Sequence, residues 1–271
     1  MGKYVKYFIG ECLGTLIMVL FGCGSVAVSV LFDAYQGLPQ IALMWGIGVS
    51  LAIYASRHLS CAHLNPAVTI AMAVNRRMKF SYVPIYLAAQ LMGAFIAGLL
   101  IYGLFSAEIA NYECLNGIIR GTPDSMLSAR MFGEYYNLPG NSMVLSMPLA
   151  MVAECFGTFL LVFLIFSLTD GCNLGKPDSN MAPLFIGLAV SSSICLVGPL
   201  TQAGLNPARD FAPRMVAWLF GWGEAAFPDH SGGFFFVYIL SPILGGLAAS
   251  LFFTQIMQRF MKKESNHDSC T

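Results

Sequence analysis

Asn65-Pro66-Ala67 and Asn206-Pro207-Ala208 are two copies of one short motif, and the segments around them decide the fold. Each copy has the residue types that begin a helix. Asn is among the preferred N-caps, and Pro is favoured at the first helical position, where its missing N–H would have no partner anyway. One such turn is a weak signal, because Asn-Pro also marks ordinary turns. Two copies in equivalent places of a repeated chain are a strong signal.

The two halves of the chain repeat the same order of segments. Glu11-Cys12-Leu13-Gly14-Thr15 opens the first long apolar run, and Glu154-Cys155-Phe156-Gly157-Thr158 opens the fourth. The Asn-Pro-Ala motif follows the second run in one half and the fifth run in the other. Since each half has three runs, the second copy must enter a membrane from the opposite side. Inverted repeats of this kind place a transit or binding site at their interface, near the membrane midplane.

The composition indicates that most of the surface faces lipid. Only 10% of the 271 residues are charged and 57% are hydrophobic, whereas soluble proteins have about 25% charged residues. Six apolar runs approach the roughly 20 residues that span a bilayer, at about 8–31, 38–55, 82–105, 143–168, 181–199 and 234–257. Residues 66–74 and 207–220 are too short or too charged to span, which is typical of re-entrant half-helices. We therefore predict an all-α integral membrane protein, with six transmembrane helices and two re-entrant half-helices that form an inverted repeat around a central pore.

We expect one channel domain over residues 1–271. Its repeats cover about 8–105 and 146–257, joined by an outer linker at about 106–145 and followed by a cytoplasmic tail at about 260–271. The charge distribution sets the orientation: of the 14 Lys and Arg residues, only Arg120, Arg130, Arg209 and Arg214 fall outside or in the outer half when the N-terminus is cytoplasmic. The positive-inside rule then predicts a multi-pass protein of the plasma (cell inner) membrane with both termini in the cytoplasm.

The two motifs are chemically suited to form the centre of a pore. Inverted symmetry points the half-helices at each other, so their positive dipole ends converge at mid-bilayer. Capping bonds fix the Asn65 and Asn206 amides and leave an N–H of each aimed into the gap. These donors would repel a cation and would orient a passing water so that it accepts from both sides, which interrupts a proton wire.

The segments before the motifs are expected to be extended, with exposed carbonyl groups. Irregular backbone at this depth is tolerated only where it lines a cavity. Carbonyl acceptors on one side and apolar walls on the other would suit a polyol. The pore-lining backbone is predicted at Cys61, Ala62, His63, Leu64, Gln202, Gly204 and Leu205.

The chain closely resembles the major intrinsic proteins, the aquaporins and glycerol facilitators, from about Phe8 to Met257. The paired motifs carry this resemblance, which implies a right-handed bundle, one pore per subunit and a homotetramer. The continuation Arg209-Asp210 with Arg214, and the segment Trp218-Leu219-Phe220-Gly221-Trp222-Gly223, look like the glycerol-facilitator (aquaglyceroporin) branch.

The resemblance places a four-residue selectivity filter at Trp45, Ile194, Ala203 and Arg209. Arg209 would present a guanidinium donor to hydroxyl groups and a barrier to cations, and Trp45 a flat apolar wall. The commoner glycerol pattern has Gly where Ile194 stands and an aromatic where Ala203 stands. This filter is instead similar to that of the plant nodulin-like branch, which passes glycerol and water. Tyr238 also stands where the glycerol branch usually has Pro.

Two carboxylates lie inside apolar runs, where ionisable residues are functional by default. Glu11 and Glu154 could relay protons in a transporter, but the resemblance favours a supporting role, in which each accepts hydrogen bonds from the loop before its motif. Asp210 is expected to support the loop as well and to organise the start of the second half-helix.

These features predict a passive channel for glycerol and related small neutral polyols, with some water, that excludes ions and protons. The alternatives are a channel mainly for water or another small neutral solute (urea, metalloid acids, dihydroxyketones) and, less favoured, a secondary transporter, for which paired pore-facing carboxylates are missing. The expected partners are neutral solutes and lipid, with no nucleic acid. No set of residues suggests an enzyme or a cofactor, and the eight cysteines form no Cys-x-x-Cys pair that would suggest a metal site.

Overall fold

The computed structural model describes residues 2–35, 37–141, 144–227 and 232–261. Most of the predicted cytoplasmic tail, including Lys262 and Lys263, and residues 142–143 of the predicted linker lie outside the described residues.

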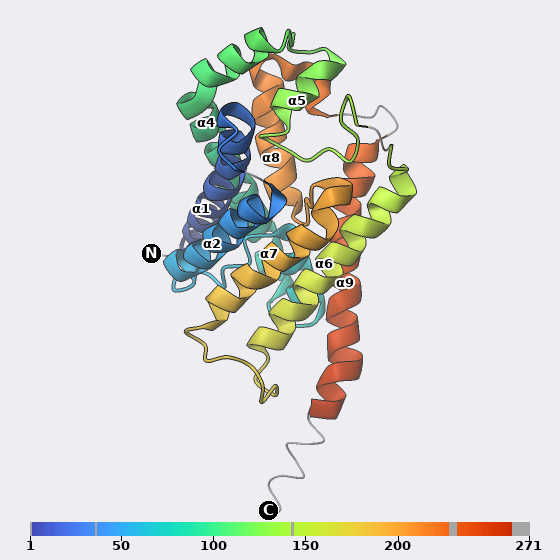
Figure 1. Ribbon diagram of the computed structural model, residues 1–271. Helices are drawn as coiled ribbons and strands as arrows, with labels where there is room; N and C mark the ends of the chain where they lie inside the picture. The colour runs from blue at the N-terminus through green and yellow to red at the C-terminus, as the bar shows by residue number, and fades with distance from the viewer. Residues whose placement is uncertain (1, 36, 142–143, 228–231, 262–271) are drawn as a thin grey trace, which may run out of the picture.

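Helices account for all the regular secondary structure of the described residues, as predicted (Figure 1). The α-helices are α1 (Lys3–Phe32), α2 (Leu38–Ser56), α3 (Pro66–Val74), α4 (Val83–Leu115), α5 (Met126–Ala129), α6 (Met147–Thr169), α7 (Ala182–Thr201), α8 (Pro207–Ala217) and α9 (Ser241–Phe252). Short 3-10 turns cover Phe80–Tyr82, Pro123–Ser125 and Gly223–Ala226, and π-helical turns cover Trp218–Trp222, Phe235–Leu240 and Phe253–Met257.

Six helical segments are long and apolar enough to cross a bilayer, which confirms the predicted number of spans. They are Lys3–Phe32, Leu38–Ser56, Phe80–Leu115, Met147–Thr169, Ala182–Thr201 and Phe235–Met261. The third helix continues well past its expected end at Phe105, because residues 106–115 contain no Gly or Pro to stop it. The first part of the predicted linker is therefore helical. The second half-helix is shorter than expected, since α8 ends at Ala217 and passes into a π-helical turn.

The helices pack in two equivalent sets that run in opposite directions. In the first half α1 packs against α2 and α4, and in the second half α6 packs against α7 and α9 in the same way. The halves meet where α2 packs against α7. Each half-helix reaches across to the other half, because α3 packs against α9 and α8 packs against α4. This exchange brings the starts of α3 and α8 together in the middle of the molecule.

Matching glycines allow the close helix contacts within each half. A Cβ atom on Gly93 of α4 would lie 2.2 Å from the Cys12 carbonyl oxygen of α1, and one on Gly245 of α9 would lie 2.0 Å from the Cys155 carbonyl oxygen of α6. Only glycine fits at such distances. Small residues at helix interfaces are the usual means of close packing in lipid, where burial of apolar side chains gives little driving force.

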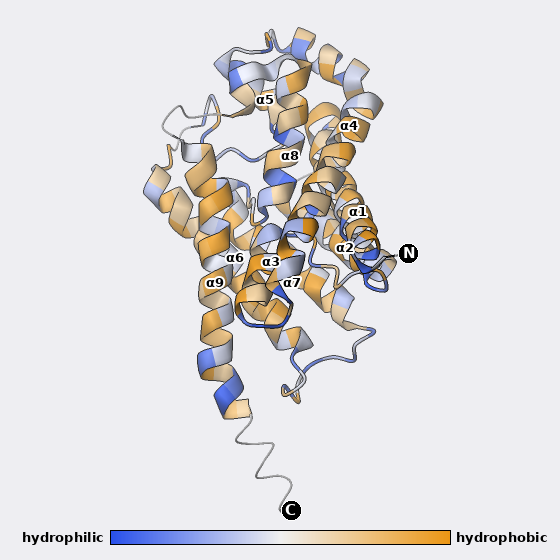
Figure 2. Ribbon diagram, turned by 180° about the vertical axis from the view of Figure 1, so that it is seen from behind, coloured by the Kyte–Doolittle hydropathy of each residue, from blue (hydrophilic) through white to orange (hydrophobic). Residues whose placement is uncertain are grey.

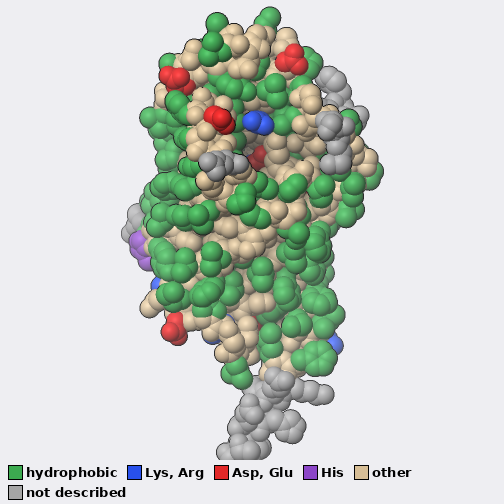
Figure 3. Space-filling view, viewed as in Figure 1, with side chains coloured by type: hydrophobic (Ala, Val, Ile, Leu, Met, Phe, Trp, Pro, Cys, Tyr) green, Lys and Arg blue, Asp and Glu red, His purple; other side chains and the backbone are tan. Residues whose placement is uncertain are grey.

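The outer surface of the bundle is apolar. Most residues of the long helices are hydrophobic (Figure 2), and in the space-filling view hydrophobic side chains cover the middle of the molecule while charged side chains lie toward its two ends (Figure 3). Exposed large side chains lie one turn apart along α2, at Leu43, Ile47 and Leu51, and along α7, at Leu184 and Leu188. Such faces are typical of lipid contact or of contact with another copy of the chain.

Candidate functional site

The two Asn-Pro-Ala turns meet at the centre of the molecule and are joined by a pair of crossed hydrogen bonds. Asn65 Nδ2 donates to the Leu205 carbonyl at 2.9 Å, and Asn206 Nδ2 donates to the Leu64 carbonyl at 2.8 Å. Each Asn side-chain oxygen caps its own half-helix, since Asn65 Oδ1 accepts from Ala67 N at 2.8 Å and Asn206 Oδ1 from Ala208 N at 3.0 Å. With the oxygen and one hydrogen so engaged, each amide keeps one N–H free.

Glu11 holds the backbone of the first loop from behind. Its Oε1 accepts from His63 N at 3.0 Å and its Oε2 from Leu64 N at 2.8 Å. Ser60 Oγ and Gln90 Nε2 donate to the same carboxylate at 2.7 and 2.8 Å. Four donors around a fully buried carboxylate compensate for the loss of its hydration.

Glu154 plays the same part in the second half. Its Oε1 accepts from Gly204 N at 2.9 Å and from Thr201 Oγ1 at 2.5 Å, and its Oε2 accepts from Leu205 N at 2.8 Å. Glu154 is also fully buried. The two carboxylates therefore bind equivalent backbone N–H groups in the two halves.

The loops before the motifs have an alternating left-handed backbone that turns their carbonyls away from these carboxylates. Ala62 and Leu64 have φ angles of 49° and 54°, and Ala203 and Leu205 have φ angles of 63° and 52°. Such conformations are uncommon outside glycine and persist where the surrounding structure imposes them. The N–H groups of these loops donate to Glu11 and Glu154. The Leu64 and Leu205 carbonyls accept from the two Asn side chains, and the remaining loop carbonyls, such as that of His63, are free to accept hydrogen bonds from a passing solute.

A cavity of about 620 Å³ passes beside the two Asn residues and these loops. All four residues of the predicted filter line it: Trp45, Ile194, Ala203 and Arg209. The Arg209 guanidinium carbon lies 4.1 Å from the centre of the Trp45 ring, so a cation–π contact fixes a donor beside an apolar wall. Of the predicted central residues, Asn65 and Asn206 line the cavity, whereas the Pro and Ala residues of both motifs are buried behind it.

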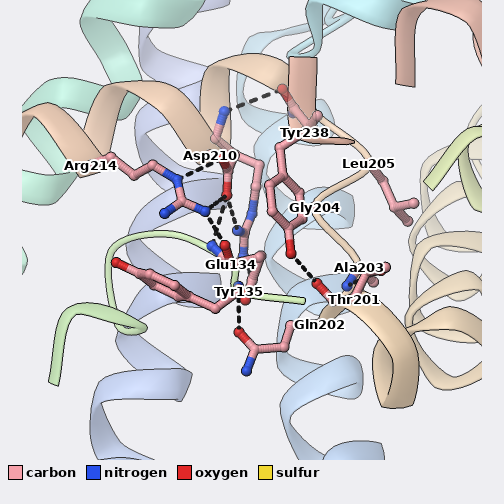
Figure 4. A network of polar contacts seen from close by, with 12 residues as sticks. Glu134, Tyr135, Thr201, Gln202, Ala203, Gly204, Leu205, Asp210, Arg214 and Tyr238 are labelled. Carbon is pink, nitrogen blue, oxygen red and sulfur yellow. Dashed lines mark hydrogen bonds and ion pairs between the residues drawn. The ribbon is translucent and has the colours of Figure 1, made fainter. Parts of the chain in front are cut away.

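A buried ion-pair network that includes Glu134, Asp210 and Arg214 (Figure 4) holds Arg209 in place. Glu134, from the linker, pairs with the Arg209 guanidinium and is 4% exposed. Asp210 accepts from Glu134 N at 2.8 Å and pairs with Arg214 at 2.8 Å. Arg214 also donates to the Glu134 carbonyl. The four side chains sum to no net charge, so the filter guanidinium is neutralised by a linker residue on one side and exposed to the cavity on the other.

Burial raises the pKa of the Glu134 carboxyl above its ordinary value, while the Arg209 guanidinium acts to lower it. Burial favours the neutral form of an acid and a nearby cation the charged form. The ion pair with Arg209 is thus intact above this raised pKa and is lost as the pH falls through it.

Two residues differ from their expected positions. Gln202 does not line the cavity: it ends α7 in a left-handed conformation with φ 64°, and its side-chain oxygen accepts from Tyr135 N at 3.0 Å. The left-handed turn directs it to the linker instead of the pore. Asp210 organises the start of α8, but it does so by binding the linker and Arg214 and not by bonding to the loop before the motif.

Tyr238 has a supporting contact that its sequence position did not suggest. Its hydroxyl donates to the Thr201 carbonyl at 2.9 Å (Figure 4). This bond satisfies one of the free carbonyls at the end of α7. The side chain is fully buried against the site.

The end of the cavity away from the linker is basic. Arg57, Arg77 and Lys176 line it there. Arg57 donates to the Ser179 carbonyl at 2.7 Å, and Arg77 pairs with Asp170 at 2.5 Å. Within the described ranges, no group of three or more His, Cys, Asp or Glu residues could hold a metal ion.

The comparisons with known proteins agree with this geometry. The sequence profile described as "Major intrinsic protein" matches residues 2–253. The chain is 42% identical over 246 residues to the glycerol uptake facilitator protein of Haemophilus influenzae, covering 89% of this chain and 90% of that one. It is 37% identical over 253 residues to the propanediol uptake facilitator of Citrobacter freundii, covering 92% of this chain and 91% of that one.

Among solved structures, the fold is similar to that of the aquaglyceroporin from Plasmodium falciparum. The TM-score is 0.81 at 26% sequence identity, and the match covers 96% of this chain and 99% of that one. The inverted helical repeat, the crossed Asn pair and the profile match over nearly the whole chain lead to one conclusion: this chain belongs to the major intrinsic protein family.

Proposed function

We propose that this chain is a passive membrane channel for glycerol and related small neutral polyols, with some water, and that it excludes ions and protons. The observation that carries the proposal is the cavity beside Trp45 and Arg209, where an apolar ring faces a fixed guanidinium 4.1 Å away. A polyol has a carbon chain on one side and hydroxyl groups on the other, so it matches both walls at once. The names of the relatives, glycerol and propanediol uptake facilitators, support the same solute class.

The route of a solute follows from the order of polar groups. At the filter a hydroxyl accepts from Arg209 while the carbon chain lies against Trp45. Deeper in, the free N–H groups of Asn65 and Asn206 donate to it, and loop carbonyls such as that of His63 accept from it. The carbon chain of the solute moves past Val49, Ile186 and Val190, which line the cavity. These side chains are apolar and bind it only weakly, so they do not hold the solute back.

Cations and protons are excluded by the same groups. The converging positive ends of α3 and α8 oppose a cation at the centre. A water molecule that accepts from both Asn65 and Asn206 has its own hydrogens turned toward the two openings, so no continuous donor chain passes through. Arg209 adds a second positive barrier.

Ile194 and Ala203 determine which solutes fit best. With a branched aliphatic side chain where the commoner glycerol pattern has Gly, and a methyl group where it has an aromatic, both positions present apolar surface to the cavity, so the filter favours solutes with an apolar flank. Diols and glycerol are therefore the leading candidates. Water, urea, metalloid acids and dihydroxyketones are the alternative solutes, and the same flux assay ranks them.

We also propose an oligomeric state and a membrane orientation for this chain. We infer a homotetramer from family membership and from the apolar outward faces of α2 and α7. The basic residues Lys3, Lys6, Arg76 and Lys79 at the end away from the linker favour cytoplasmic termini in the plasma (cell inner) membrane. One channel domain then comprises both repeats and the linker that carries Glu134.

Stopped-flow light scattering on proteoliposomes tests the function. The proposal predicts glycerol and propanediol fluxes well above those of protein-free liposomes, with no change of internal pH under a proton gradient. Water flux without polyol flux would instead select the water-channel alternative, and saturable flux driven by a proton or sodium gradient would select the transporter.

A further inference from the structure

A second cavity lies at the linker end of the molecule, separate from the channel. It has a volume of about 350 Å³ and is formed by described linker residues, among them Arg130, Tyr135, Asn141 and Leu145, together with residues 198–200 and Gln202 at the end of α7. None of its lining residues lines the channel cavity. Its size falls within the range of small-molecule sites. Its lining contains one cationic side chain, Arg130, and no carboxylate.

Arg130 has an unused guanidinium in this cavity. Its Nε atom is buried without a hydrogen-bond partner, and no hydrogen bond or ion pair joins its side chain to any other residue in the described parts of the chain. The other arginines at this end differ: Arg120 pairs with Glu113 at 2.8 Å, and Arg209 and Arg214 pair with Glu134 and Asp210. A buried donor without a partner is costly, so a ligand that supplies the acceptor would gain from it.

Gln202 supplies a second donor to the lining of the same cavity. The Gln202 side-chain oxygen is held by Tyr135 N at 3.0 Å (Figure 4), which fixes the orientation of the amide. Its Nε2 has no hydrogen bond within the described ranges and is left as a donor. Asn141, exposed at the rim, adds an amide within the same lining. The unused polar groups of the side chains are therefore mainly donors, while the backbone at the end of α7 contributes carbonyl acceptors.

We propose that this cavity binds a small oxyanion, a carboxylate or a phosphate group, between the Arg130 guanidinium and the Gln202 amide. A planar guanidinium presents parallel N–H groups that match two oxygens of such a group. Glu134 does not compete for Arg130, because it already pairs with Arg209. A neutral polyol would leave the Arg130 charge uncompensated, whereas an oxyanion neutralises it.

Isothermal titration calorimetry tests the site on the full-length protein in nanodiscs of zwitterionic lipid. Sodium phosphate and sodium acetate are the probes, with sodium chloride added to keep the ionic strength constant. Saturable binding is expected for the wild type. Arg130→Gln should weaken it by about tenfold or more, because a charge-assisted bond is lost, and Arg130→Lys should weaken it less. Arg76→Gln, which changes an exposed arginine at the other end, is the matched control.

Gln202→Glu provides an independent variant. Glutamate keeps the oxygen that accepts from Tyr135 N but replaces the Nε2 donor with a negative oxygen, so oxyanion binding should disappear. Glycerol flux in chloride should be the same for Arg130→Gln as for the wild type, which shows that the variant is folded. Equal phosphate affinity in the wild type and in both Arg130 variants would overturn the proposal.

A phosphate group could come from solution or from a lipid headgroup, and a second bilayer separates these sources. If anionic phospholipid replaces part of the zwitterionic lipid and the phosphate isotherm of the wild type is unchanged, the site takes a free anion. If the isotherm disappears only in that bilayer, a headgroup occupies the site. The absence of Arg130-dependent binding in both bilayers would contradict the oxyanion site.

Discussion

Replacing Glu154 with Gln exchanges one carboxylate oxygen for an NH₂ group in the support of the loop before Asn206. The favourable orientation keeps the amide oxygen at the Oε1 position, where it accepts from Gly204 N and Thr201 Oγ1. The new NH₂ group then faces the Leu205 N–H, which now donates to Oε2 at 2.8 Å. One buried N–H loses its acceptor and meets another donor. We expect the variant to lose about 1–3 kcal/mol of stability, the usual result of leaving a buried group unsatisfied.

The same change should reach the pore centre. The Leu205 carbonyl accepts from Asn65 Nδ2 at 2.9 Å, so movement of Leu205 away from the new NH₂ group disturbs the crossed Asn pair. Glycerol flux in proteoliposomes and the midpoint of thermal unfolding in detergent should therefore both fall. Glu108→Gln is the control, because Glu108 is exposed on the extension of α4 and should change neither measurement.

The repeat supplies a matched variant in Glu11→Gln. Its new NH₂ group would leave the Leu64 N–H without an acceptor in the same way. The Gln90 amide, however, has an Oε1 that is buried without a partner, and it can rotate so that this oxygen accepts from the new NH₂ group. The loss of stability should be no larger than that of Glu154→Gln. Unchanged stability and polyol flux in both variants would refute the supporting role. A loss of proton-coupled uptake at normal stability would indicate a proton relay instead.

Three further predictions concern the filter and the cavity. Glu134→Gln should lower polyol flux by releasing Arg209, and wild-type flux should fall as the outer pH drops through the raised pKa of Glu134; a pH dependence that persists in the variant would argue against this pair. Ala203→Phe should reduce polyol flux more than water flux in stopped-flow assays, because it narrows the ring; an equal loss of both would contradict the filter assignment. A charged thiol reagent should block solute flux by reacting with Cys61, which lines the cavity, and its reaction with Cys195, which is exposed but does not line the cavity, should not block flux; inhibition that persists in Cys61→Ser would disprove this.

The repeated motifs were enough to predict most of the fold. Asn followed by Pro specifies a helix start through local chemistry, and the order of apolar runs places two such starts in inverted positions. The predicted helix ends were wrong where the sequence has no local residue signal, such as Gly or Pro, that stops a helix. The third span passes into the extension of α4 without a Gly or Pro, so hydropathy marks where the lipid-facing run ends and not where the helix ends.

The parts of the site that depend on distant contacts could not be predicted. Glu134 lies in a polar linker, and nothing local distinguishes it from Glu108 or Asp124; only the fold brings it to Arg209. Gln202 was predicted to line the pore, because the residue types around it fit an extended loop as well as they fit the left-handed end of a helix. The role of Tyr238 depends on a carbonyl at the end of another helix.

The central claim is that the crossed Asn pair and the filter form a passive pore for neutral polyols. The most direct test measures glycerol flux by stopped-flow light scattering, in wild-type proteoliposomes and in those of Asn206→Asp. That change replaces the donor to the Leu64 carbonyl, now 2.8 Å away, with a second acceptor and adds a negative charge. We predict rapid, non-saturating glycerol flux without proton or cation conductance in the wild type, and lower glycerol flux in the variant. Wild-type flux that requires an ion gradient, or normal flux in the variant, would contradict the account.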